Sequence, residues 1–72
     1  MKSFIIVDDN ETTKYDAEKT FDTPNESGIT DYDFLIDEMG FDTSTVWDME
    51  RMAVLETIRP KHGNNLIITR IA

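Results

Sequence analysis

Hydrophobic residues gather near the two ends of the chain in short runs that are typical of β-strands. The first run, residues 4–7, is aromatic and β-branched and leads into the acidic turn 8–10, which predicts a buried strand. The second run, residues 66–71, follows the turn formers of residues 60–64. We expect these strands, near residues 3–8 and 65–71, to be adjacent in one sheet.

The segment from residue 12 to residue 23 has a weaker pattern, in which Tyr15, Ala17 and Phe21 stand among charged residues. It can form a second strand in a hairpin with the first, or a short helix over residues 14–21. We favour the strand. Residues 23–28 then combine proline, asparagine, serine and glycine, which predicts a loop.

Residues 31–39 have the spacing of a helix. Thr30 is a good N-cap, and two aspartates follow it in the first turn, where the helix dipole favours acidic side chains. The apolar residues Phe34, Leu35 and Met39 recur at helical spacing until Gly40 ends the run. We therefore expect a helix over residues 31–39 that packs on the sheet.

A second helix is expected to begin between residues 42 and 45, where several N-cap residues occur in a row and Thr45 to Asp48 resembles a capping box. Its end stays open, because residues 54–59 fit either a longer helix or a strand, and Pro60 favours extended geometry before it. If this segment is extended, it forms a hairpin with the C-terminal strand. The tip of that hairpin is basic and consists of Arg59, Lys61 and His62.

Together these elements predict one domain over residues 1–72, of the α+β class. We expect a small single sheet that includes the N- and C-terminal strands and packs against one or two helices. Seven side chains are expected to be mostly buried, namely Phe4, Ile6, Phe34, Leu35, Met39, Trp47 and Ile67. A chain of this length buries a modest core, and with no cysteine it has neither a disulfide nor a thiolate zinc site to support the fold.

The composition narrows the classes of function. The apolar runs are far shorter than a bilayer span and the N-terminus lacks a signal-peptide pattern, so we expect a cytoplasmic protein without a membrane partner. The single histidine, His62, lies in a polar turn, and no P-loop or calcium loop is present. We therefore expect no enzyme activity, no cofactor and no metal site.

Charge is the strongest functional signal, and it is unevenly distributed. The net charge is −8, but residues 1–50 contain 14 acidic and three basic residues, whereas residues 51–72 contain one acidic and four basic residues. Such an acidic surface repels nucleic acid and attracts basic surfaces. The simpler alternative is that the acidity confers solubility alone.

Residues 32–51 resemble a helix-turn-helix, with Gly40 at the turn, and a following hairpin with a basic tip would extend the resemblance to a winged helix. The alternative function is therefore a winged-helix-like DNA-binding or transcription accessory protein. Its candidate recognition helix would bring Asp48 and Glu50 to DNA with Arg51 alone to balance them, which opposes approach to phosphate. Bases clustered with Arg51 at the hairpin tip would favour the alternative.

The leading hypothesis is a small acidic, non-enzymatic binding protein that engages a basic protein surface, belonging to a nucleic-acid-handling partner, without binding nucleic acid itself. In size and charge the chain resembles the small acidic inhibitors that phages make against host restriction, CRISPR or nucleoid proteins, some of which act as DNA mimics. The residues expected to bind the partner are Asp31, Asp33, Asp37, Glu38, Asp42, Asp48 and Glu50.

Overall fold

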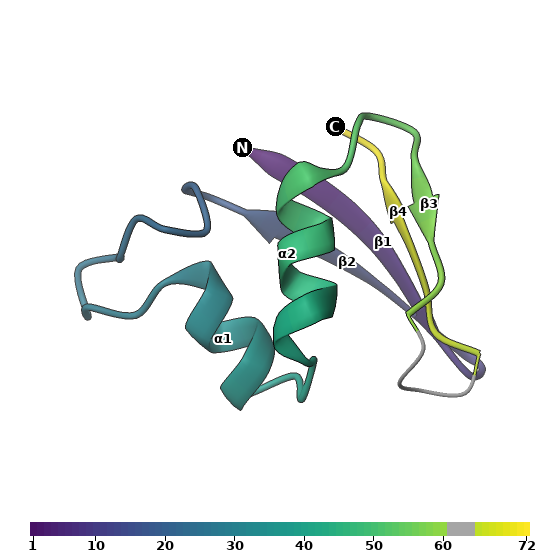
Figure 1. The fold of residues 1–72 in the computed structure, drawn as a ribbon, viewed down its shortest axis with the longest axis horizontal. Helices are drawn as coiled ribbons and strands as arrows, with labels where there is room; N and C mark the ends of the chain where they lie inside the picture. Colours follow the sequence, from purple (N-terminus) through teal and green to yellow (C-terminus); the bar gives the residue numbers. More distant parts are fainter. Residues whose placement is uncertain (61–64) are drawn as a thin grey trace.

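In the part of the chain that the structure describes, four antiparallel strands form one sheet, and two helices pack against one of its faces (Figure 1). The computed structural model describes residues 1–60 and 65–72. In chain order the elements are β1 (Lys2–Asp8), β2 (Glu11–Ala17), α1 (Asp31–Asp37), α2 (Thr43–Arg51), β3 (Thr57–Ile58) and β4 (Ile67–Arg70). The strand order in the sheet is β2-β1-β4-β3. The predicted α+β class and single sheet are confirmed.

The centre of the sheet is formed by the two strands that lie furthest apart in the sequence. β1 pairs with β4, with Ile6 opposite Ile68, so the predicted adjacency of the N- and C-terminal strands is confirmed. β1 also pairs with β2 along its whole length, with Phe4 opposite Tyr15, which confirms the strand favoured for this segment. Because side chains alternate along a strand, Phe4, Ile6 and Ile68 face the helices.

Helix α1 begins where its capping residues predict. The Thr30 hydroxyl accepts a hydrogen bond from the Asp33 backbone N–H at 3.0 Å, and the Asp33 carboxylate accepts one from the Thr30 N–H at 3.4 Å. The helix ends at Asp37, two residues before the predicted end. Gly40 follows with a φ of 75°, a left-handed conformation that glycine adopts without a steric penalty.

Helix α2 is capped by Asp42, whose carboxylate accepts a hydrogen bond from the Thr45 N–H at 3.2 Å, so the helix begins earlier than the pattern of Thr45 to Asp48 suggests. It ends at Arg51, and the chain then turns through Leu55, which has a φ of 72°. The open question for residues 54–59 is thereby answered, since the segment is extended where it contributes Thr57 and Ile58 to the sheet. Of the expected basic tip, Lys61 and His62 lie outside the described residues.

Within residues 1–60 and 65–72 the core contains ten buried apolar side chains, which come from the sheet, both helices and the loops: Phe4, Ile6, Ala17, Phe21, Leu35, Val46, Met49, Met52, Leu66 and Ile68. Three of the seven expected core residues, Phe4, Ile6 and Leu35, are among them. Met39 and Ile67 are half-buried, Ile67 because it faces away from the helices.

The expectation is wrong for Phe34 and Trp47, which are 40% and 47% exposed. Phe34 directly precedes the buried Leu35, and Trp47 directly follows the buried Val46. Successive residues of a helix point about 100° apart. When Leu35 and Val46 face the sheet, their neighbours are turned to the flank of the helix.

Candidate functional site

The acidic residues expected to bind a partner extend over α1, α2 and their connection, and several of them also support the fold. Asp33 belongs to the capping box of α1, and Asp42 caps α2. Asp48 lies 3.6 Å from Arg51 in an exposed ion pair. A carboxylate at these positions is accounted for by helix capping or local pairing, whatever else it binds.

Glu50 is held inside the structure by the N-terminal strand. Its carboxylate lies 3.6 Å from the Lys2 ammonium, and that ammonium also donates a hydrogen bond of 2.7 Å to the Glu50 carbonyl oxygen. Lys2 further lies over the ring of Phe21, 5.5 Å from its centroid. Because both charged side chains are about three-quarters buried, this pair fastens α2 to β1 and presents little charge to a partner.

Asp37 and Glu38 differ from the other acids, because they are exposed and lie at the C-terminal end of α1. Among the described residues neither takes part in an ion pair, and the last turn of α1 contains no basic residue. The negative end of the helix dipole disfavours carboxylates at this position. With Asp33, which is also exposed, they form what we call the α1 acidic surface, defined by Asp33, Asp37 and Glu38.

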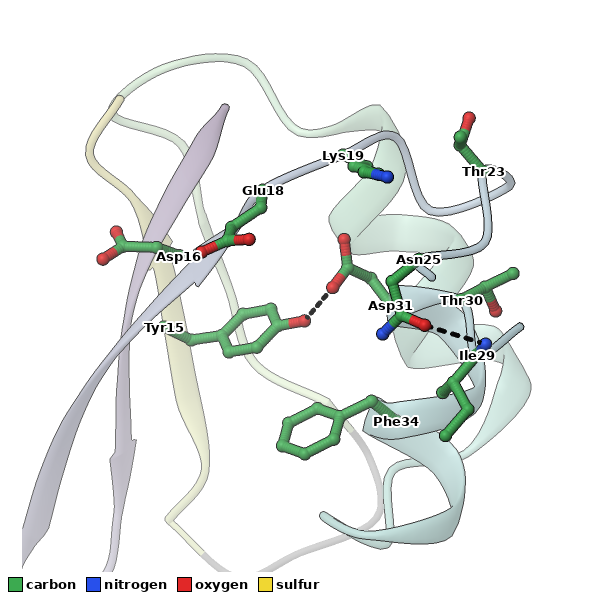
Figure 2. Close-up of a pocket in the computed structure, with 10 residues that line it drawn as sticks. All are labelled: Tyr15, Asp16, Glu18, Lys19, Thr23, Asn25, Ile29, Thr30, Asp31 and Phe34. Carbon is green, nitrogen blue, oxygen red and sulfur yellow. Dashed lines mark hydrogen bonds between the residues drawn. The ribbon is translucent and has the colours of Figure 1, made fainter. Parts of the chain in front are cut away.

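A cleft of about 300 Å³ lies between β2, the loop that follows it and the start of α1 (Figure 2). At its base the Tyr15 hydroxyl donates a hydrogen bond of 2.8 Å to Asp31 Oδ1. The Tyr15 and Phe34 rings are nearly parallel, with an interplanar angle of 6° and centroids 5.9 Å apart. The cleft therefore has an aromatic wall and a carboxylate whose position is fixed by a hydrogen bond.

The outer wall of the cleft is a loop with its own hydrogen bonds. The Asn25 side-chain oxygen accepts hydrogen bonds from the backbone N–H groups of Ser27, at 2.8 Å, and Ile29, at 3.1 Å. The Asn25 N–H in turn donates to the Ile29 carbonyl at 2.9 Å. Gly28, with a φ of 79°, permits the tight turn between them. These bonds hold Asn25 and Ile29 at the rim opposite Tyr15 (Figure 2).

The charge of the cleft is predominantly negative. Glu18 and Asp31 contribute carboxylates to it, and Lys19 is the basic residue among its lining side chains, whereas the carboxylate of Asp16 points away from the cleft (Figure 2). Asp16 is held by a hydrogen bond of 2.6 Å from the Ser3 hydroxyl. Burial of the phenol, the hydrogen bond to Asp31 and the charge of that carboxylate all raise the pKa of Tyr15 well above its ordinary value. Tyr15 is therefore a neutral hydrogen-bond donor at physiological pH.

Of the seven acids expected to bind a partner, Asp31 alone lines this cleft, and Tyr15, Asp16 and Glu18 were not anticipated there. Residues 15 and 31 are distant in the sequence, and the only local signal was the strand alternation that turns Tyr15 towards the helices. The remaining six acids are spread over both helices and their connection.

In the described structure Arg51 and Arg59 are not brought together, whereas Lys2 and Arg70 both donate to carbonyl oxygens at the end of α2, beside Arg51. Arg51 is the last residue of α2, which ends near the chain termini (Figure 1), whereas Arg59 directly follows Ile58, whose partner Ile68 lies further along the sheet from those termini. The Arg70 guanidinium donates hydrogen bonds to the carbonyl oxygens of Met52, at 2.6 Å, and Ala72, at 3.0 Å. Arg70 thereby fastens the turn after α2 to β4.

No protein-family model, curated protein or solved structure was found to match the chain. Over residues 1–60 and 65–72, no three histidine, cysteine, aspartate or glutamate side chains are grouped as metal ligands. None of the helices in those residues is long and apolar enough to cross a membrane. The acidic cleft and the α1 acidic surface are therefore the features from which a function can be argued.

Proposed function

We propose that this protein is a non-enzymatic binding protein whose acidic side engages a basic, nucleic-acid-handling protein, in the manner of a DNA mimic or a phage-type inhibitor. The concentration of acid in residues 1–50 supplies the attraction, because opposite charges steer association and speed encounter. The proposal keeps the cytoplasmic location expected from the sequence, where nucleic-acid-handling proteins work.

The observation that carries the proposal is the α1 acidic surface. Asp37 and Glu38 oppose the helix dipole, and Asp37 lies four residues from Asp33, a spacing at which like charges destabilise a helix by a few tenths of a kcal/mol. The stability of α1 thus gains nothing from Asp37 and Glu38, in contrast to Asp33, which belongs to its capping box. Their presence is accounted for if a basic partner binds them.

The separation of Arg51 from Arg59 supports this proposal over a winged-helix protein. A winged helix would use Arg51 and the hairpin bases together against phosphate, but Arg51 ends α2 near the chain termini (Figure 1), and Arg59 follows Ile58 further along the sheet from those termini. Arg51 is also paired with Asp48 on the same helix. The helix that would enter a DNA groove therefore presents a carboxylate next to its one exposed base.

The test reverses Asp37 and Glu38 together to lysine, which suits the C-terminal end of a helix and leaves the core unchanged. The probe is a panel of small basic DNA-binding proteins held on labelled duplex DNA at about 0.15 M salt, with release of the DNA as the measurement. The unmodified protein should release DNA from at least one panel member. The reversed variant should need roughly tenfold more protein, mainly through slower association.

The matched control reverses Asp8 and Glu11, which face each other at the β1–β2 hairpin, far from α1 (Figure 1). It changes the net charge equally and should release DNA as the unmodified protein does. Equal losses in both variants would show that total charge, rather than the α1 acidic surface, acts on the partner. Sub-micromolar binding of the unmodified protein itself to duplex DNA would overturn the proposal and favour the winged helix.

A further inference from the structure

The cleft between β2 and α1 combines three properties that act on the same ligand. It is large enough for one long side chain, at about 300 Å³, which is the lower end of the range for small-ligand sites. It contains the carboxylates of Glu18 and Asp31, which disfavour an anion. It also contains the ring of Phe34, which remains 40% exposed although it stacks on Tyr15.

We propose that this cleft receives one arginine side chain of the basic partner. The inference rests on the proposed function for the class of partner, and it adds the place where that partner is anchored. The guanidinium would lie against the exposed surface of Phe34 and donate hydrogen bonds to the carboxylate of Asp31. Glu18, which lies across the cleft from Asp31, supplies a second negative charge (Figure 2).

Arginine fits this cleft better than lysine does. A guanidinium is planar, stacks on aromatic rings and donates from a rigid fork that matches a carboxylate, whereas an ammonium is a compact and strongly hydrated point charge. The cleft offers both an aromatic surface and a carboxylate, and each is fixed in advance. Asp31 is held by the Tyr15 hydroxyl at 2.8 Å, and Phe34 by stacking on the same ring.

Fixing these groups before the ligand arrives lowers the entropy lost on binding. Tyr15 connects the two, because its hydroxyl contacts Asp31 while its ring contacts Phe34. Asp31 also begins α1, directly after its N-cap, and the Asn25 turn holds the facing rim. The cleft is thus built from a strand, a helix and a hydrogen-bonded loop.

Lys19 disfavours binding of the proposed ligand, so the test can look for a gain of affinity as well as for a loss. Its ammonium is the basic group among the side chains that line the cleft, so it repels an incoming guanidinium and offers Asp31 and Glu18 a competing partner. Removal of this charge should strengthen arginine binding. A role of the cleft in stability alone predicts no such gain.

The experiment titrates isotope-labelled protein with N-acetyl-arginine methylamide and follows backbone amide shifts by NMR. The lysine derivative and the uncharged citrulline derivative, which has nearly the shape of arginine, are the comparison ligands. We expect saturable binding of the arginine derivative in the millimolar range, with the largest shifts at Asn25, Ile29 and Phe34. Lysine should bind at least threefold more weakly, and citrulline should cause no saturable shift.

Three variants give the expected order of affinities for arginine. Asp31→Asn should weaken binding about fivefold, Lys19→Gln should strengthen it about twofold, and Asp8→Asn, which removes the same charge at the β1–β2 hairpin, should leave it unchanged. Glu18→Gln provides a second loss of charge on an exposed loop residue, in case Asp31→Asn disturbs α1. It should weaken binding about twofold.

Any of three results would overturn the proposal: equal shifts with arginine and citrulline, shifts spread over the α1 acidic surface instead of the cleft, or equal effects of Asp31→Asn and Asp8→Asn. The result is separable from the test of function, because the isolated arginine derivative needs no partner protein. If the protein releases DNA from a basic protein but does not bind the arginine derivative, the cleft is not the arginine site, and the proposed function is still supported. If the arginine derivative binds but no DNA is released, the cleft is an arginine site and the proposed function is wrong.

Discussion

Tyr15 contacts both β1 and α1, which its position in the sequence did not indicate. Its ring stacks on Phe34 from α1 and on Phe4 from β1, and its hydroxyl donates to Asp31. The phenol is half-buried, so the hydrogen bond to Asp31 satisfies a donor that would otherwise lose its water. One residue thereby joins the sheet to the helix and forms the base of the cleft.

This environment predicts a dependence of stability on alkaline pH. The pKa of Tyr15 is raised in the folded protein, so above about pH 10 the unfolded chain loses the phenol proton while the folded protein retains it. The free energy of unfolding should therefore fall as the pH rises through this value. Tyr15→Phe should be less stable at pH 7, by about 1 kcal/mol, but should lose less stability between pH 9 and 11.

The measurement is the urea midpoint of the unmodified protein and of Tyr15→Phe across that pH range. Tyr32→Phe is the matched control, since it removes a hydroxyl from the other tyrosine, which packs edge-on against Trp47. Parallel pH profiles for the unmodified protein and Tyr15→Phe would show that the folded protein ionises Tyr15 as readily as the unfolded chain does.

At the scale of elements, α1 places a single fully buried side chain in the core. Leu35 is the one fully buried residue of this seven-residue helix, and it meets the core between sheet and α2. A helix this short is not stable alone in water, so its packing decides whether it forms. Loss of the Leu35 contact should release α1 and, with it, one wall of the cleft.

Leu35→Ala should lower the free energy of unfolding by about 2 to 5 kcal/mol, because it removes buried methyl groups and leaves a cavity. Trp47→Ala removes a larger side chain that is 47% exposed, and it should cost less despite its size. Urea denaturation of both variants gives the comparison. A larger loss for Trp47→Ala would mean that its contact with Tyr32 supports α1 more than the core does.

The sequence was informative about elements whose signals are local. The aromatic and β-branched run at residues 4–7 predicted β1, and Thr30 with its two aspartates predicted the start of α1. The face that each helix turns towards the sheet was less predictable. Phe34 and Leu35 are equally apolar, and the packing against the sheet decides which of them is buried. The cleft could not be predicted, since it depends on how the loop brings Asp31 back to Tyr15.

At the scale of the whole molecule, acidic residues outnumber basic ones by 15 to seven, histidine aside. The described ion pairs are three in number, and the exposed ones contribute little to stability. Repulsion among the remaining carboxylates should therefore dominate the electrostatic free energy at pH 7. Added salt should then weaken binding to a basic partner and increase the stability of the fold.

Moderate salt should raise the melting temperature at pH 7, because a shorter screening length weakens repulsion among the acids. Thermal unfolding at about 0.02 M and 0.3 M sodium chloride provides the measurement, and solubility should fall near the calculated isoelectric point of about 4.3. The Asp37 and Glu38 reversal to lysine should show a smaller rise than the unmodified protein. A melting temperature that falls with salt would show that attractive pairs dominate instead.

The central position of β4 also bears on how the protein is made. The register joins Ile6 to Ile68, more than 60 positions later in the chain, and β3 pairs with the sheet only through β4. On the ribosome, β1, β2 and both helices emerge before the strand that completes their core, and contacts of such separation form slowly. A nascent chain therefore exposes Phe4 and Ile6 until β4 has left the exit tunnel, and during that interval the unfinished sheet is open to chaperones and proteases.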